Sequence, residues 1–158
     1  MRRPGVRRIA VRRSSVHGRG VFALTDLAAD EDIIDYGGEV IPWAEAQARY
    51  EHSDAAAGHT FFFDLGDGSV IDGGRGGNSS RWLNHGCEPN CEAVQHADKI
   101  VIRACRPITS GEELLIDYRL SVDGRSNAAT RALYVCRCGA PSCCGTMLAT
   151  RRTAVGKT

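Results

Sequence analysis

RWLNHGCEPNC, the sequence of residues 81–91, combines an asparagine–histidine pair, two cysteines, a proline and a second asparagine directly after an apolar pair. Buried polar side chains cost free energy unless they find hydrogen-bond partners, so a core does not carry such a cluster by accident. The stretch is a more specific indication of fold and function when it is considered with two distant segments, GEELLIDY at residues 111–118 and CRCGAPSC at residues 136–143.

The composition is that of an ordinary globular domain. The chain has 158 residues, of which 42% are apolar and 25% are charged, and this length suits one domain with a real core. Its 18 glycines predict turns and backbone-lined sites rather than long helices. Since no apolar run has the length of a membrane span and no signal peptide is recognisable, we expect no membrane partner and a cytosol-like compartment.

The seven cysteines favour a metal site over a disulfide framework, because their number is odd and four lie within residues 136–144. Three of them form a CxCx₄C cluster: Cys136, Cys138 and Cys143. A tetrahedral structural zinc site needs a fourth ligand, and Cys144 suits it poorly because adjacent side chains diverge. Cys87 and Cys91 are therefore the candidates. Unliganded thiols or a redox pair are the alternative.

Charge is distributed unevenly, although the net charge is only +1. Six arginines lie in the first thirteen residues, whereas residues 26–54 hold nine acidic residues against Arg49 alone. A basic arm suits nucleic acid and an acidic middle suits a basic peptide, but solvated faces explain either patch equally well.

The predicted secondary structure is mostly β, with short strands and little helix. We expect strands at residues 9–13, 21–24, 33–41, 61–65, 69–72, 99–104 and 114–118. The glycine pair at 37–38 interrupts one of them, which suggests a bulge or a close approach to a ligand. Pro42 and Gly58 bound the one predicted helix, at residues 43–58.

Several further residues have the chemistry of a binding site. The glycines of HGRG, residues 17–20, allow backbone amides to approach an anion, although an ordinary turn explains the pattern as well. Asn84 and His85 suit a catalytic pair, a ligand clamp or a buried network. Tyr36 and Tyr118 suit either the rim of the core or, with the phenylalanines at 61–63, a narrow aromatic slot.

Taken together, five segments resemble the SET-domain protein-lysine N-methyltransferases that carry a C-terminal post-SET zinc motif. They are HGRGVF at 17–22 for the first cofactor motif, DYGGEVI at 35–41 for YxGE, RWLNHGCEPNC at 81–91 for RFxNHSCxPNC, GEELLIDY at 111–118 for GEELxxDY, and CRCGAPSC at 136–143 for the post-SET CxCx₄C. The resemblance runs in order from about Arg8 to Leu148.

The resemblance implies a β-clip-like SET fold, in which small β-sheets surround a pseudoknot formed by the segment at 84–85 and the strand ending at Tyr118. It also implies one insert helix and a zinc-bound C-terminal segment. The expected organisation is a basic arm at 1–8, a SET domain at 9–118 with the insert helix at 43–58, a linker at 119–135, a post-SET zinc segment at 136–148 and a tail at 149–158.

The resemblance implies S-adenosylmethionine as methyl donor and a structural zinc ion. The implied cofactor-binding residues are His17, Gly18, Arg19, Gly20, Phe61, Arg81, Asn84, His85 and Tyr118. The implied catalytic residues are Tyr118, Tyr36 and His85. The implied lysine channel is lined by Tyr36, Phe61, Phe63 and Ile116. The implied zinc ligands are Cys87, Cys136, Cys138 and Cys143, which leaves Cys91, Cys105 and Cys144 spare.

Two positions depart from the family pattern. Gly86 replaces a serine, and Ile116 stands where phenylalanine or tyrosine usually tunes the number of methyl groups added. We expect a roomier pocket that is compatible with di- or trimethylation.

The expected function is methylation of lysines in a basic protein, histone H3 or a histone-like protein. The alternative is a catalytically silent, zinc-stabilised module that binds a basic peptide or nucleic acid, with the N-terminal arginines as the nucleic-acid contact. The alanine-, arginine- and glycine-rich composition favours a bacterial protein, with the cytoplasm as the default location and export to a host nucleus as the alternative.

Overall fold

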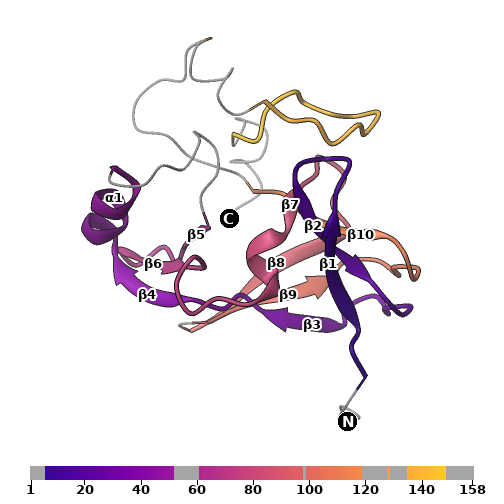
Figure 1. The fold of residues 1–158 in the computed structure, drawn as a ribbon, viewed down its shortest axis with the longest axis horizontal. Helices are drawn as coiled ribbons and strands as arrows, with labels where there is room; N and C mark the ends of the chain where they lie inside the picture. Colours follow the sequence, from indigo (N-terminus) through magenta and orange to yellow (C-terminus); the bar gives the residue numbers. More distant parts are fainter. Residues whose placement is uncertain (1–5, 52–60, 98, 119–127, 129–134, 149–158) are drawn as a thin grey trace.

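Three small β-sheets and one short α-helix form the described part of the chain in this computed structural model (Figure 1). The structure describes residues 6–51, 61–97, 99–118, 128 and 135–148. Its elements are β1 (Ile9–Arg13), β2 (Arg19–Ala23), β3 (Asp32–Asp35), β4 (Glu39–Pro42), α1 (Trp43–Glu51), β5 (Phe62–Asp64), β6 (Ser69–Asp72), the 3₁₀ helix η1 (Ser79–Trp82), β7 (Asn84–His85), β8 (Cys91–His96), β9 (Lys99–Ala104) and β10 (Glu113–Ile116). The predicted mostly-β fold class is confirmed.

The first sheet has the order β1-β2-β10-β7. It brings together parts of three sequence motifs, in β2, β7 and β10. Strand β10 is antiparallel to β2 but parallel to β7, with Leu115 opposite Asn84 and Ile116 opposite His85. The side chain of Asn90 continues this pairing, since its amide donates to the Glu113 carbonyl at 2.8 Å and its oxygen accepts from the Leu115 N–H at 2.8 Å. Residues 84–86 and Asn90 therefore both bond β10, which brings together the two segments expected to form the pseudoknot.

The other two sheets have the orders β3-β9-β8 and β4-β6-β5. Alternation along the strands builds the core, because successive side chains point to opposite faces. In β9, Ile100, Ile102 and Ala104 are each at most 2% exposed, and Leu114 of β10 is fully buried. These side chains belong to one cluster that also contains residues of β2, β3 and β6. All three sheets therefore share a single main core.

The helix α1 packs against the third sheet through Ala46, which is buried with Ile41 of β4 and Val70 of β6, and through Arg49. Arg49 forms ion pairs with Glu45 one turn earlier, with Glu39 of β4 at 3.1 Å and with Asp72 of β6 at 2.8 Å. The predicted helix at 43–58 is described only as far as Glu51, since residues 52–60 lie outside the described part. No helix in the described ranges is long and apolar enough to cross a membrane.

Two predicted strands need correction, and strand β8 was missed. The strand expected at 33–41 is two strands, β3 and β4, in different sheets, so the glycine pair marks a change of sheet rather than a bulge. The strand expected at 114–118 ends at Ile116. Strand β8 was not predicted, because most of its residues are exposed at the edge of a sheet and carry no apolar alternation.

Candidate active site and metal centre

Tyr118 and His85 meet where β7 and β10 end side by side. The Tyr118 backbone N–H donates to His85 Nδ1 at 3.0 Å, and the Tyr118 hydroxyl donates a short hydrogen bond to the Leu83 carbonyl. His85 is 4% exposed. Burial lowers the pKa of His85, and the Asp117 carboxylate, 3.7 Å from Nδ1, opposes this only in part. Because Nδ1 accepts, the proton of the neutral imidazole sits on Nε2.

Asn84 holds the turn between β1 and β2 against β7. Its amide nitrogen lies 3.1 Å from the His17 carbonyl, 2.9 Å from the Arg19 carbonyl and 2.8 Å from Glu113 Oε1. Among the described residues, no hydrogen bond reaches the carboxamide oxygen of Asn84, whose side chain is nearly buried. The predicted cofactor motif at residues 17–20 is therefore tied directly to the asparagine–histidine pair.

Two arginines and two aromatic rings gather beside this turn. The guanidinium groups of Arg19 and Arg81 lie 5.3 and 5.0 Å from the Trp82 ring centroid, and the Phe61 ring meets Trp82 edge-on at 5.3 Å. The Nε of Arg81 is buried and has no hydrogen-bond partner among the described residues. A buried donor without a partner is costly, so this atom suits an anionic group of a ligand.

The predicted lysine channel is a group of aromatic and aliphatic side chains. The Tyr36 hydroxyl donates to the Phe61 carbonyl at 2.7 Å, and the Tyr36 and Phe63 rings lie 5.2 Å apart. Ile116 and Tyr118 pack in the same cluster as Tyr36 and Phe63. Burial, followed by the charges of neighbouring groups, raises the pKa of Tyr36 and of Tyr118 above the usual value of a phenol.

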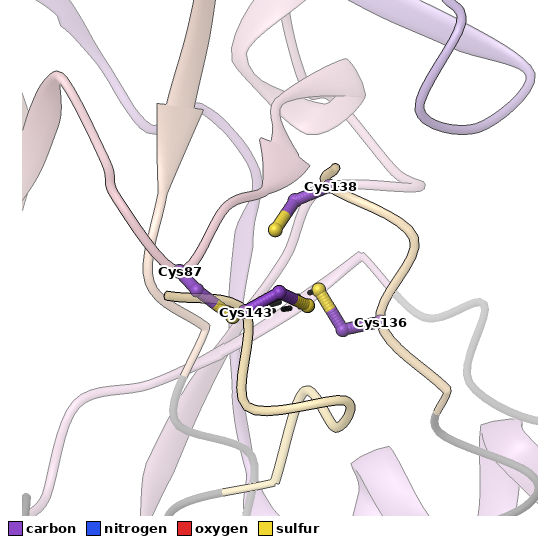
Figure 2. Close-up of side chains that lie close together, drawn as sticks. All are labelled: Cys87, Cys136, Cys138 and Cys143. Carbon is purple, nitrogen blue, oxygen red and sulfur yellow. Dashed lines mark hydrogen bonds between the residues drawn. The ribbon is translucent and has the colours of Figure 1, made fainter. Parts of the chain in front are cut away.

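Four cysteine sulfurs converge at the C-terminal segment. Figure 2 shows them pointing toward one another, and the Sγ atoms of Cys87, Cys136, Cys138 and Cys143 all lie within 4.8 Å of each other. Cys91 is instead buried in β8, opposite Ala104 of β9. Cys144 Sγ lies 3.4 Å from Cys87 Sγ but outside the group of four. Of the two candidates for the fourth position, the structure thus brings Cys87 to the cluster.

Three of these thiols have shifted pKa values. Burial raises the pKa of Cys87 and raises that of Cys136 to about 11. Burial also acts on Cys138, but hydrogen bonds from neighbouring backbone and thiol groups outweigh it and lower its pKa to about 7. Of these three, Cys138 is therefore the thiol that most readily becomes a thiolate, which is the form that binds metals.

The sequence model of the SET domain family matches residues 18–119. The chain belongs to the SET domain family. The match includes most of the turn at 17–20, the Asn84–His85 pair and Tyr118, and it ends before the cysteine-rich segment at 136–143.

Curated relatives resemble this SET domain over most of its length. Histone-lysine N-methyltransferase 2B from Homo sapiens is 37% identical over 139 residues, which is 85% of the chain and 5% of that relative. The H3 lysine-4 specific histone-lysine N-methyltransferase of Kluyveromyces lactis is 38% identical over 138 residues, 84% of the chain and 13% of the relative. Histone-lysine N-methyltransferase SETD1 from Drosophila melanogaster is 34% identical, over 85% of the chain and 8% of the relative. The chain thus spans a small part of these longer proteins.

The glycines of two of the predicted motifs, Gly18 and Gly86, differ in how closely they are packed. His17 and Arg19 contribute carbonyls to the Asn84 clamp, while Gly18 opens onto space in which a Cβ would meet no atom within 4 Å. At Gly86, where the family usually has serine, a Cβ would lie 2.9 Å from Leu115 Cδ1, so the glycine fits the close packing against β10.

Sequence reasoning missed three residues of this site. Trp82 stacks with both arginines, and Ser14 and Glu113 join the clamp around Asn84. Glu113 lies inside the GEELLIDY motif, which is the signal that could have singled it out. Ser14 had no such signal, because its partner is 99 residues away.

Proposed function

We propose that this SET domain is an S-adenosylmethionine-dependent protein-lysine methyltransferase that acts on a basic protein, histone H3 or a histone-like protein. The observation that carries the proposal is the meeting of Tyr118 with the Asn84–His85 strand in a chain of this family. Named histone-lysine N-methyltransferases that align with 84–85% of the chain support the same reaction.

The residues of the candidate active site fit S-adenosylmethionine, the proposed methyl donor. The buried, unpartnered Nε of Arg81 suits a carboxylate, and the Asn84 carboxamide oxygen suits an ammonium group. Exposed Gly18 leaves room for close approach of a ligand to the turn. When bound, S-adenosylmethionine supplies an activated methyl group on a positively charged sulfur.

The protein's own contribution is to orient and neutralise the lysine. Methyl transfer is an in-line displacement, so holding the amine in near-attack geometry is the main gain. The rings of Tyr36 and Phe63 lie 5.2 Å apart and pack in one cluster with Tyr118, and the substrate lysine would be desolvated against them. Desolvation there favours the neutral amine, because burial lowers the pKa of a lysine. Aromatic faces also accept the methylammonium product.

We infer that the four-cysteine group binds structural zinc. Zn–S bonds of about 2.3 Å in a tetrahedron place the sulfurs about 3.8 Å apart. Cys87 Sγ lies 3.6 Å from Cys136 Sγ and 3.9 Å from Cys143 Sγ, which matches that spacing. Zinc would fasten the segment at 136–148 to the loop after β7, and so build one wall of the site.

A basic substrate suits the acidic residues of the middle of the chain. Nine acidic side chains lie within residues 26–54, against a single arginine. We therefore propose a lysine- and arginine-rich peptide as the substrate, handled by a SET domain at 9–118 with a post-SET zinc segment at 136–148. Nucleic-acid binding through the arm at 1–8, of which 1–5 lie outside the described residues, and a bacterial cytoplasmic location are proposed with it.

The test is transfer of labelled methyl groups. We expect the protein to label histone H3 or its N-terminal peptide when it is incubated with labelled S-adenosylmethionine, and we expect Tyr118→Phe to lose this activity. If the wild-type protein labels no basic protein but binds the peptide in calorimetry, the silent binding module is the correct interpretation.

A further inference from the structure

We propose that Glu113 is a positioning residue for the methyl donor, because its carboxylate fixes both the carboxamide of Asn84 and the turn at residues 14–20. This inference rests on the proposed function and deepens it. Neither Glu113 nor Ser14, its partner on the turn, belongs to the residues that the sequence predicts to touch the donor.

Glu113 accepts hydrogen bonds from two separate parts of the chain. The Ser14 hydroxyl lies 2.8 Å from Oε1 and 2.9 Å from Oε2, and the Asn84 amide lies 2.8 Å from Oε1. The Glu113 backbone is itself held, since it pairs with Phe22 of β2 and its carbonyl accepts from Asn90. The carboxylate is thus a fixed acceptor between the turn and β7.

Ser14 has only its hydroxyl proton to offer Glu113. Its oxygen accepts from the backbone N–H groups of Val16 at 3.0 Å and His17 at 3.4 Å, and its own N–H donates to the Gly18 carbonyl at 2.9 Å. A partner on the Glu113 side must therefore be an acceptor. A glutamine oxygen can accept from both partners only at the Oε1 position, and this turns the N–H₂ group at the Oε2 position toward the Ser14 hydroxyl, which is itself a donor there.

The same logic fixes the orientation of Asn84. Its amide nitrogen faces three oxygens, those of His17, Arg19 and Glu113, so the N–H₂ group must point toward them. The carboxamide oxygen consequently points the other way, ready to accept from a ligand. Glu113 is the only one of the three acceptors that a substitution of a side chain can remove.

Close packing leaves little room for rearrangement. A Cβ on Gly20 would lie 2.0 Å from Glu113 Oε1 and 3.1 Å from Ser14 Cβ, so the glutamate lies directly over the turn. Loss of the carboxylate would therefore remove the Ser14 anchor of the turn and one of the three acceptors that orient Asn84, and so loosen the turn that carries the predicted donor-binding residues His17 and Arg19.

Calorimetric titration with S-adenosylhomocysteine, the demethylated donor, tests this without relying on activity. We expect Glu113→Gln to raise its Kd by at least about tenfold, which corresponds to about 1.4 kcal/mol. Ser14→Ala should weaken binding as well, and Ser14→Thr should restore it because the hydroxyl returns. The matched control is Glu112→Gln, whose carboxylate instead bonds Arg106 and the Thr109 N–H.

The kinetic readout separates positioning from loss of structure. We expect Glu113→Gln to raise KM for the donor while KM for the peptide and the circular dichroism spectrum stay within error. Unchanged Kd in Glu113→Gln and Ser14→Ala, with tight binding by the wild type, would overturn this inference and leave the proposed function standing. No binding by the wild type would overturn both. If Glu113→Gln does not fold, the Kd values of Ser14→Ala and Ser14→Thr decide between these outcomes.

Discussion

The backbone N–H of Tyr118 donates to Nδ1 of His85 at 3.0 Å. The other ring nitrogen of His85 lies 3.6 Å from Cys87 Sγ. One imidazole therefore connects the tyrosine proposed to act on the lysine with a sulfur proposed to bind zinc. Loss of a metal bound to Cys87 would therefore change the surroundings of His85, and through His85 the position of Tyr118.

Removal of one zinc ligand should unload the metal and weaken the fold. We expect Cys87→Ser to lose zinc, measured by mass spectrometry of bound metal, and to lower Tm by roughly 10 °C, because loss of a metal site is among the largest single-residue effects. Chelation of the wild type should lower Tm similarly.

The neighbouring cysteine supplies the control for that experiment. Cys144→Ser removes a thiol 3.4 Å from Cys87 Sγ that lies outside the group of four. It should retain one zinc per chain. Loss of zinc in Cys144→Ser with retention in Cys87→Ser would show that the ligand set is assigned incorrectly.

Removal of the Tyr118 hydroxyl should slow chemistry more than binding. We expect Tyr118→Phe to lower kcat by about a hundredfold, the usual cost of one preorganised group in an active site, while Kd for S-adenosylhomocysteine changes little. Tyr50→Phe, on the exposed face of α1, is the control and should have wild-type kcat. Equal kcat in both variants would remove Tyr118 from the mechanism.

The pH profile of kcat/KM should show no decrease at about pH 10. Burial raises the pKa of Tyr36 and Tyr118, so both phenols stay neutral in the folded state where an exposed tyrosine would ionise, at about 10. We expect kcat/KM to rise from pH 7 to pH 10 as the substrate lysine loses its proton. A bell-shaped profile with a descending pKa close to 10 would contradict this.

The same raised pKa values predict how stability depends on pH. The unfolded chain releases the tyrosine protons above about pH 10, whereas the folded chain keeps them, so the free energy of unfolding should fall as pH rises beyond that value. Urea denaturation at pH 8 and pH 10.5 measures the change, and Tyr36→Phe should reduce it.

Ile116 should set the number of methyl groups added. Its side chain is 5% exposed and packs in the same cluster as Tyr36, Phe63 and Tyr118. We expect di- or trimethylated peptide from the wild type and from Ile116→Val, and mainly monomethylated peptide from Ile116→Phe, because a ring fills the space that extra methyl groups need. Mass spectrometry of the product decides, and a purely monomethylated wild-type product would contradict the prediction.

Motifs predicted the site better than periodicity predicted the strands. The chemistry of residues 81–91 and 136–143 singled out the cysteines and the Asn84–His85 pair, since such polar clusters are costly without partners. The choice of Cys87 over Cys91 came from the family resemblance, because thiol spacing alone fits both. In the structure Cys91 is 1% exposed in β8, and its side chain belongs to the core cluster.

Contacts between distant residues could not be predicted from local sequence. Ser14 reads as an ordinary turn residue, and only the pairing of β10 with β2 brings it to Glu113. Strand β8 was missed for a related reason: its backbone pairs along six residues of β9, but its exposed side chains carry no periodic signal. Tertiary pairing, rather than residue type, decides such elements.

Strand β10 also has a consequence for synthesis on the ribosome. β2 ends at Ala23 and β10 begins at Glu113, so about 90 residues are translated between them, which takes roughly 5 to 20 s. During that time β1 covers only one edge of β2, and the other edge has no strand to pair with. An open strand edge invites pairing with other chains. The nascent β1–β2 hairpin is therefore open to such pairing until β10 has been made.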